Sequence, residues 1–262
     1  MRFALLFSGM SFRRHVNGLE FCYRTLVERL GVPAGNIQVL NYDGSLRAFG
    51  EDAPEPDRLW PGDATPYRMK VTAEGSREQF RCSMRHIGSS LGRDDQLFIN
   101  TTGHGGHHGT DAGPDLLAFP NGRRLSRDEF CESISELPRH RAMIVLMSQC
   151  FGGGFAQAVL EASPASSTVV VSASRERRSS FMSFESNDWD SFQRNWLAAF
   201  GGRDVDGSPS TTQRSAGTSD QCACTSVADA FQLASSGARA NPYDSPQLNA
   251  FPSSAGSLCF RD

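Results

Sequence analysis

Short apolar segments alternate with amphipathic segments along most of this chain, and this alternation constrains its fold more than any other feature. Five apolar runs have the length of buried strands: residues 2–7, 37–41, 97–99, 142–147 and 168–171. Parallel strands need crossover connections, and helices between them cover both faces of the sheet. The sequence therefore predicts an α/β fold, a three-layer sandwich with a mainly parallel central sheet.

The segments between the apolar runs carry helical spacing or turn signals. Apolar residues recur every three or four positions in the predicted helices, residues 17–30, 76–91, 126–134, 155–161 and 227–234. Ser126 and Glu129 have the spacing of a capping box. Residues 50–67 contain four prolines and predict a loop. We expect a single domain over residues 1–262, with a flexible loop at about 201–225.

Composition excludes several classes of function. The chain has 262 residues, and its hydrophobic content of 39% is ordinary for a globular protein. A net charge of −3 argues against nucleic-acid binding. No apolar run approaches the ~20 residues of a membrane helix, and the N-terminal apolar block is too short for a signal peptide. The seven cysteines show no framework spacing, so we expect reduced thiols and a cytoplasmic protein.

Two reactive residues follow predicted strands. His104 lies after residues 97–99 and before Gly105, and Cys150 lies after residues 142–147 and before a run of glycines. A lone cysteine after a strand is most often a core residue, and a lone histidine in a glycine-rich loop is often without function. Carboxyl ends of parallel strands meet at one edge of a sheet, however, where an imidazole activates a thiol. We therefore interpret the two residues as a catalytic dyad.

This pattern resembles the caspase-like cysteine peptidases of clan CD, in which a histidine followed by glycine precedes the cysteine by about 50 residues. Here His104 and Cys150 are 46 residues apart. Legumains are the most similar group, and the likeness extends over roughly residues 1–200. The segments that carry it are Arg14-His15, residues 32–43, residues 95–99, residues 172–174, residues 179–180 and residues 187–189.

The resemblance implies a caspase-like sandwich and an endopeptidase that cleaves protein or peptide substrates. His104 would be the catalytic base and Cys150 the nucleophile. The backbone amides of Gly105 and Cys150 would face the developing oxyanion. Such a peptidase needs no cofactor or metal, and we expect neither nucleic acid nor membrane as a partner.

The resemblance also indicates substrate-binding residues. Arg14 matches an arginine of the legumain specificity pocket, Ser148 lies two positions before the cysteine, and Ser174 falls in the pocket wall. Glu185 lies near the acidic residue of that pocket. These matches predict cleavage after Asn or Asp. Ser148 stands where legumains have Glu and caspases have Gln, and Phe12 stands where legumains orient the histidine. The Phe12 side chain cannot accept a hydrogen bond, so a backbone carbonyl would have to orient the histidine instead.

Three alternatives remain open. A preference for Arg at the cleaved position, as in metacaspases, would need acidic residues in the pocket. A catalytically weak or inactive domain of this fold would only bind partners. A metal-dependent hydrolase would use the histidines of the glycine-rich loop. The candidate acids are Asp43, Asp111, Glu185 and Asp188, and the candidate metal ligands are His104, His107, His108 and Asp111.

Overall fold

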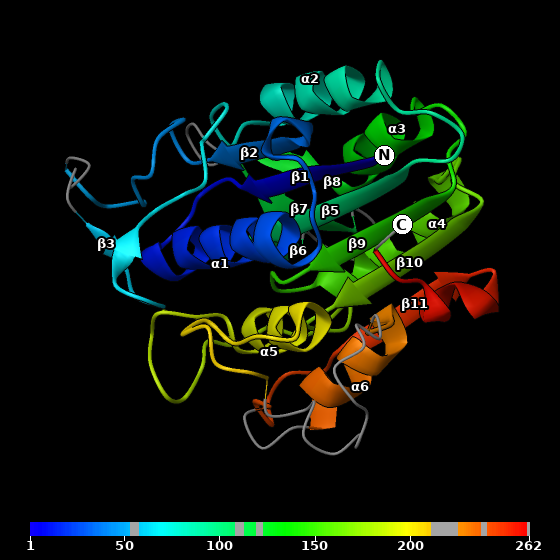
Figure 1. Cartoon of the computed structure of the whole chain (residues 1–262). Helices are drawn as coiled ribbons and strands as arrows, with labels where there is room; N and C mark the ends of the chain where they lie inside the picture. The colour runs from blue at the N-terminus through cyan, green and yellow to red at the C-terminus, as the bar shows by residue number, and fades with distance from the viewer. Residues whose placement is uncertain (53–57, 108–112, 119–122, 211–224, 237–239, 261–262) are drawn as a thin grey trace.

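A six-stranded sheet forms the centre of the molecule (Figure 1). The computed structural model describes residues 1–52, 58–107, 113–118, 123–210, 225–236 and 240–260. Five neighbouring strands run parallel, and one edge strand is antiparallel to its neighbour. In order across the sheet, the strands are β11 (Gln247–Phe251, the antiparallel one), β10 (Ser167–Ser172), β9 (Ala142–Met147), β5 (Gln96–Thr102), β1 (Arg2–Ser8) and β2 (Ile37–Asn41).

Helices cover both faces of this sheet (Figure 1), which confirms the predicted three-layer sandwich. Each face has its own cluster of buried apolar side chains. The helices on one face are α1 (Arg13–Arg24), α5 (Ser191–Gly201) and α6 (Val227–Ser236). The helices on the other face are α2 (Arg77–Gly88), α3 (Arg127–Ser135) and α4 (Ala156–Ala162).

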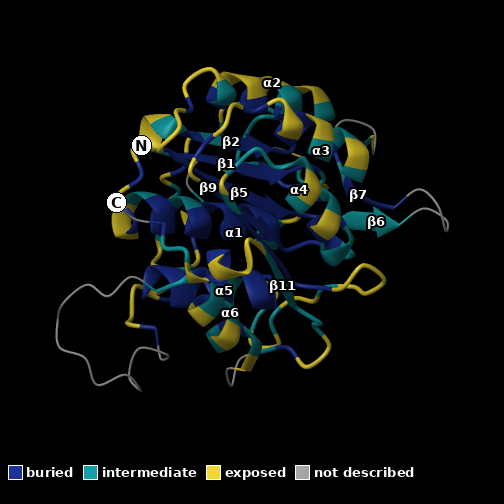
Figure 2. Cartoon of the chain, turned by 90° about the vertical axis from the view of Figure 1, so that its right-hand side faces the viewer, coloured by how far each residue is buried: buried dark blue, intermediate teal, exposed yellow. Residues whose placement is uncertain are grey.

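Strand β1 shows why an uninterrupted apolar run is needed at the centre of the sheet. Leu6 packs into the cluster below α1, whereas Leu5 and Phe7 pack into the cluster below α2. Successive side chains of a strand point to opposite faces, so both faces of β1 must be apolar. Figure 2 shows the central strands of the sheet as buried, and Leu5 and Leu6 are fully buried. Burial of each leucine contributes about 2 kcal/mol to stability.

The carboxyl ends of the parallel strands lie level with one another. Ser8 at the end of β1 pairs with Asn41 of β2 and with Thr102 of β5. Met147 at the end of β9 pairs with Thr101 and with Ser172 of β10. Loops that leave these strands therefore begin at the same edge of the sheet, which is where ligands bind in open parallel sheets.

Capping residues determine where two of the predicted helices begin. The Ser76 hydroxyl accepts a hydrogen bond from the N–H of Gln79 at the start of α2. Ser126 and Glu129 form the capping box at the start of α3, as predicted. Each pair satisfies backbone N–H groups that have no partner within the first helical turn.

The first helix differs from its prediction over residues 17–30. It begins at Arg13, and after Arg24 it continues as a π-helix, Thr25–Arg29. The N–H of Leu30 donates to the carbonyl oxygen of Thr25, five residues earlier. The residues of its first turn include two arginines and a histidine, so apolar spacing alone could not indicate the true start.

Helix α5, strand β11 and several short strands were not predicted. Residues 50–67, predicted as a loop, include β3 (Leu59–Trp60) and β4 (Thr65–Pro66). The short strands β6 (Gly105–His107), β7 (Pro114–Leu117) and β8 (Arg124–Ser126) form a separate antiparallel sheet.

The predicted flexible loop at 201–225 is only partly covered by the structure. Residues 202–210 are described and include buried Asp204 and Val205, so this portion is not exposed throughout. Residues 211–224, with Cys222 and Cys224, lie outside the described residues. The single domain over residues 1–262 stays a prediction. No helix in the described ranges is both long and apolar enough to cross a bilayer.

Candidate active site

His104 and Cys150 follow two strands that are neighbours in the middle of the sheet. His104 lies two residues after β5, and Cys150 lies three residues after β9. The N–H of Ser148 donates to the carbonyl oxygen of Thr101 at 2.9 Å, so the strands stay paired up to their ends. The sheet therefore brings both reactive residues to one edge.

The backbones of these two loops touch each other at Gly105. A Cβ atom at this position would collide with the carbonyl oxygen of Cys150. Gly103 has a φ of 113°, in the range that favours glycine, and it turns the chain between β5 and His104. The glycines on either side of His104 thus permit a close approach of the two loops that other residues would prevent.

The Cys150 thiol lies against the segment that follows β10. The N–H of Ser180 lies 3.4 Å from Cys150 Sγ and the Ser180 hydroxyl lies 3.7 Å from it. The Ser180 carbonyl oxygen is 3.8 Å from the same sulfur. Phe151, the next residue, has a φ of 63°, and its N–H donates to the carbonyl oxygen of Arg178 at 2.9 Å. This bond holds the chain in a conformation that non-glycine residues seldom adopt.

The His104 imidazole is surrounded by rings. Its centroid lies 4.5 Å from that of Phe12 and 5.3 Å from that of His15, and both contacts are edge-to-face. His104 Nε2 is buried and has no hydrogen-bond partner within the described part of the chain. Burial, and next the charge of Arg14, lower the pKa of His104, so the imidazole is mostly neutral at pH 7.

A buried charged cluster lies behind His104. Arg14 Nε donates to Asp190 Oδ1 at 3.0 Å, and the Thr102 hydroxyl donates to Asp190 Oδ2 at 3.0 Å. His15 Nδ1 accepts the N–H of Phe12 at 2.9 Å, which leaves the proton of neutral His15 on Nε2, 3.7 Å from Asp190 Oδ2. Burial raises the pKa of Asp190, and Arg14 opposes that shift. Burial lowers the pKa of His15 well below its ordinary value.

Sequence reasoning missed Asp190 and the position of Ser180. Ser180 belongs to the legumain-like residues 179–180, and Asp190 directly follows residues 187–189, where Asp188 was the acid considered. Asp188 is exposed, whereas Asp190 is buried against Arg14. The signal in the sequence was the cluster of acids around Trp189, but only the fold shows which acid points inward.

The remaining predicted substrate-binding residues lie in different surroundings. Ser148 is buried, and its hydroxyl has no partner among the described residues. Ser174 is also buried, and its hydroxyl donates to the carbonyl oxygen of Gln149 at 3.3 Å. The Glu185 side chain is 52% exposed and pairs with Arg194 at 3.3 Å. Arg14 is thus the predicted pocket residue that lies close to His104, and binding roles for the other three stay predictions.

The histidines and acid of the glycine-rich loop were considered as metal ligands, and the described ones do not form a metal-binding cluster. In the described ranges, no group of three or more His, Cys, Asp or Glu side chains is arranged to hold one. The ring of His107 faces Phe151, with centroids 6.0 Å apart. His108 and Asp111, on which the metal alternative depends, lie outside the described residues. Of the acids considered for an arginine-binding pocket, Asp43 pairs with Arg47 at 2.9 Å.

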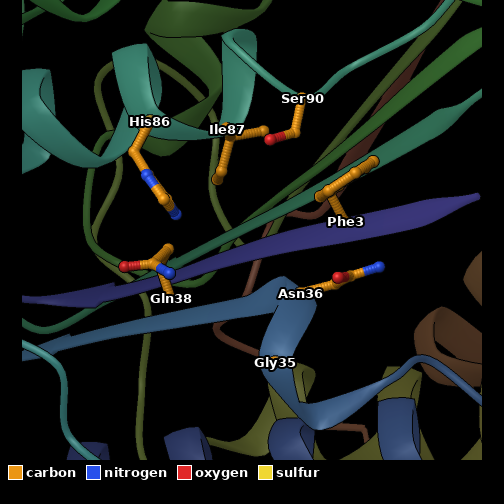
Figure 3. Close-up of a pocket in the computed structure, with 7 residues that line it drawn as sticks. All are labelled: Phe3, Gly35, Asn36, Gln38, His86, Ile87 and Ser90. Atoms are coloured by element: carbon orange, nitrogen blue, oxygen red, sulfur yellow. The ribbon is translucent and has the colours of Figure 1, made fainter.

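A small cavity lies at the opposite end of the sheet (Figure 3). Its volume is about 70 Å³, and it opens between α2 and the amino-terminal ends of β1 and β2. Figure 3 shows His86 and Ile87 of α2 across from Phe3 and Gln38. His104 and Cys150 follow the carboxyl ends of their strands, so this cavity is separate from the candidate active site.

Comparisons with known proteins identify a family and a similar fold. Residues 2–212 match the model of the peptidase C13 family, in line with the resemblance to legumains. No curated protein matches the chain significantly. The crystal structure of protein GSU0716 from Geobacter sulfurreducens is similar with a TM-score of 0.56. Its sequence is 13% identical, and the match covers 95% of this chain and 92% of that one, so the similarity concerns the fold.

Proposed function

Because the chain belongs to the peptidase C13 family, we propose that it is a cysteine endopeptidase with His104 as the base and Cys150 as the nucleophile. The observation that carries this proposal is the contact between their loops. Neighbouring strands β5 and β9 bring both residues to one edge of the sheet, and the loop backbones touch at Gly105. The substrate is a protein or peptide, and a cytoplasmic location stays a prediction.

The reaction begins with a proton transfer from the Cys150 thiol to the neutral imidazole of His104. The thiolate sulfur attacks the carbonyl carbon of the scissile bond, and the backbone N–H groups of Gly105 and Cys150 stabilise the oxyanion. His104 then protonates the leaving amine as the C–N bond breaks. Water, deprotonated by His104, hydrolyses the thioester and restores the thiol.

The surroundings of His104 suit a general base better than a permanent cation. Burial and Arg14 lower the pKa of the imidazole, so it is unprotonated at neutral pH and able to accept the thiol proton. The protonated imidazole is then short-lived and releases its proton readily to the leaving amine.

Arg14 and Asp190 support a preference for Asn or Asp at the cleaved position. Arg14 Nε is bonded to Asp190, and a guanidinium has further N–H donors for a substrate. An Asn amide can use both a donor from Arg14 and an acceptor from Asp190, whereas an Asp carboxylate can use only the donor. We therefore expect cleavage after Asn to be faster than cleavage after Asp.

The test is cleavage of a mixed peptide library, read by mass spectrometry, with the wild-type protein, Cys150→Ala and Cys82→Ala. Cys82 is an exposed cysteine on α2 and serves as the matched control. We expect cuts after Asn or Asp from the wild type and from Cys82→Ala, and none from Cys150→Ala. A wild type that makes no cuts, with Cys150 unreactive toward iodoacetamide, would reject the proposal in favour of a partner-binding domain.

A further inference from the structure

The contacts of Ser180 with Cys150 go beyond what the dyad requires. The backbone N–H, the hydroxyl and the carbonyl oxygen of Ser180 all lie within 4 Å of Cys150 Sγ. A protonated thiol can donate to the carbonyl oxygen, whereas a thiolate can accept from the N–H and the hydroxyl. The same residue therefore has a partner for each protonation state of the sulfur.

The segment around Ser180 is held in place on both sides. Before it, the N–H of Phe151 is bonded to the carbonyl oxygen of Arg178 at 2.9 Å. After it, the N–H of Phe181 donates to Asp244 Oδ1 at 2.9 Å, and Asn241 Nδ2 donates to the carbonyl oxygen of Met182 at 3.0 Å. Donors that are fixed before the reaction stabilise a charge better than donors that must first reorient.

A stabilising donor at the sulfur is needed because His104 does not supply a permanent positive charge. Many thiolates are stabilised by a protonated histidine beside them. Here the imidazole is enclosed by Phe12 and His15, and burial favours its neutral form. Neutral hydrogen-bond donors are then the means of stabilising the thiolate as the proton leaves for His104, and charge-assisted bonds of this kind are stronger than neutral ones.

We propose that Ser180 is a catalytic residue that stabilises the Cys150 thiolate, with its hydroxyl as the donor that a substitution can remove. The inference rests on the proposed function, since it assigns Ser180 to the same reaction. The thiol proton goes to His104, and no bond to Ser180 is made or broken. Ser180 and Cys150 are 30 residues apart, and the resemblance to legumains gave Ser180 no role at the sulfur.

The experiment measures the rate at which iodoacetamide alkylates Cys150, as a function of pH. Peptide mapping by mass spectrometry separates Cys150 from the other cysteines. The proteins are the wild type, Ser180→Ala, Ser180→Thr and the neighbouring exposed control Ser179→Ala. Thermal unfolding followed by circular dichroism checks that each variant is folded.

We expect Ser180→Ala to lower the alkylation rate at pH 7 about threefold to tenfold and to move the pH midpoint of alkylation upward. Ser180→Thr keeps a hydroxyl and should restore both quantities, and Ser179→Ala should match the wild type. An Ser180→Ala profile that superimposes on the wild-type profile would overturn the inference. Alkylation needs no peptide substrate, so a wild type that cuts no peptide would count against the proposed function and not against this inference.

Discussion

The two residues of the candidate dyad lie on loops that touch, yet their surroundings are opposite in kind. His104 is enclosed by the rings of Phe12 and His15, and its Nε2 atom has no partner within the described residues. Cys150 faces polar atoms of one residue, Ser180, which is anchored through its neighbours. The base lies among aromatic rings, and the nucleophile lies beside hydrogen-bond donors.

This difference shows how a histidine–cysteine dyad can work when the two residues do not form an ion pair before the reaction. A neutral imidazole is ready to accept a proton, and nearby donors stabilise the thiolate that the transfer creates. The two surroundings also come from different parts of the chain. Residues 12–15 at the start of α1 enclose the histidine, whereas residues 178–182 and 241–244 lie on the side of the cysteine.

The largest effect is expected from removal of the base. His104→Ala should lower kcat/KM for a cleaved peptide about 10³-fold, because the thiol then lacks its proton acceptor. The alkylation rate of Cys150 at pH 8.5 should change only about twofold, because a neutral ring does not stabilise the thiolate. Equal losses in both measurements would indicate that His104 and Cys150 form an ion pair before the reaction. This would contradict the difference between their surroundings. His107→Ala, on strand β6, is the matched control.

The next effect concerns the charged cluster behind His104. Arg14→Gln should lower the free energy of unfolding by about 3 kcal/mol, because the Asp190 carboxyl stays buried without its cation. The double variant Arg14→Gln/Asp190→Asn should lose less. Urea unfolding measures both values, with the exposed Arg175→Gln as the control. Equal losses in the single and double variants would show that Asp190 does not depend on Arg14.

A smaller, pH-dependent effect is expected on the side of the cysteine. Burial raises the pKa of Asp244 to about 7, although the Phe181 N–H opposes the shift. Between about pH 4 and pH 7 the folded protein therefore holds a proton that the unfolded chain has lost, so stability falls as pH rises through this range. Asn keeps the acceptor for Phe181 but does not titrate.

Asp244→Asn should therefore gain stability relative to the wild type as pH rises from 5 to 8. We expect a gain of about 1–2 kcal/mol, less than the full shift implies because the carboxyl is partly exposed. Urea unfolding at several pH values measures it, and Asp188→Asn on the surface is the control. If the difference in unfolding free energy between variant and wild type stays constant with pH, Asp244 does not have the raised pKa.

The smallest effect tests the ring enclosure itself. Phe12→Ala should expose His104 and raise its pKa toward the ordinary value. The acid limb of kcat/KM then moves to higher pH, because the active neutral imidazole is lost earlier as pH falls. NMR titration of the His104 ring measures the pKa directly, and Phe184→Ala removes an exposed ring as the control. An unchanged pKa would show that Phe12 does not shield the base.

The central strands could be predicted because their local sequence is sufficient to define them. Residues 142–147 are apolar throughout, as a strand buried on both faces must be, and they form β9. Strand β11 could not be predicted in this way. Its residues, from Gln247 to Phe251, are mixed in polarity and half-exposed, and they become a strand through pairing with β10.

The sequence by itself determined the alternation of strands and helices, and with it the edge of the sheet from which His104 and Cys150 project. Local signals were enough here, because glycines and apolar runs act on their immediate neighbours. Only the tertiary structure decided what surrounds the two residues. Asp190 reaches Arg14 across 176 residues and Ser180 reaches Cys150 across 30, and such contacts depend on how distant segments pack rather than on any local pattern.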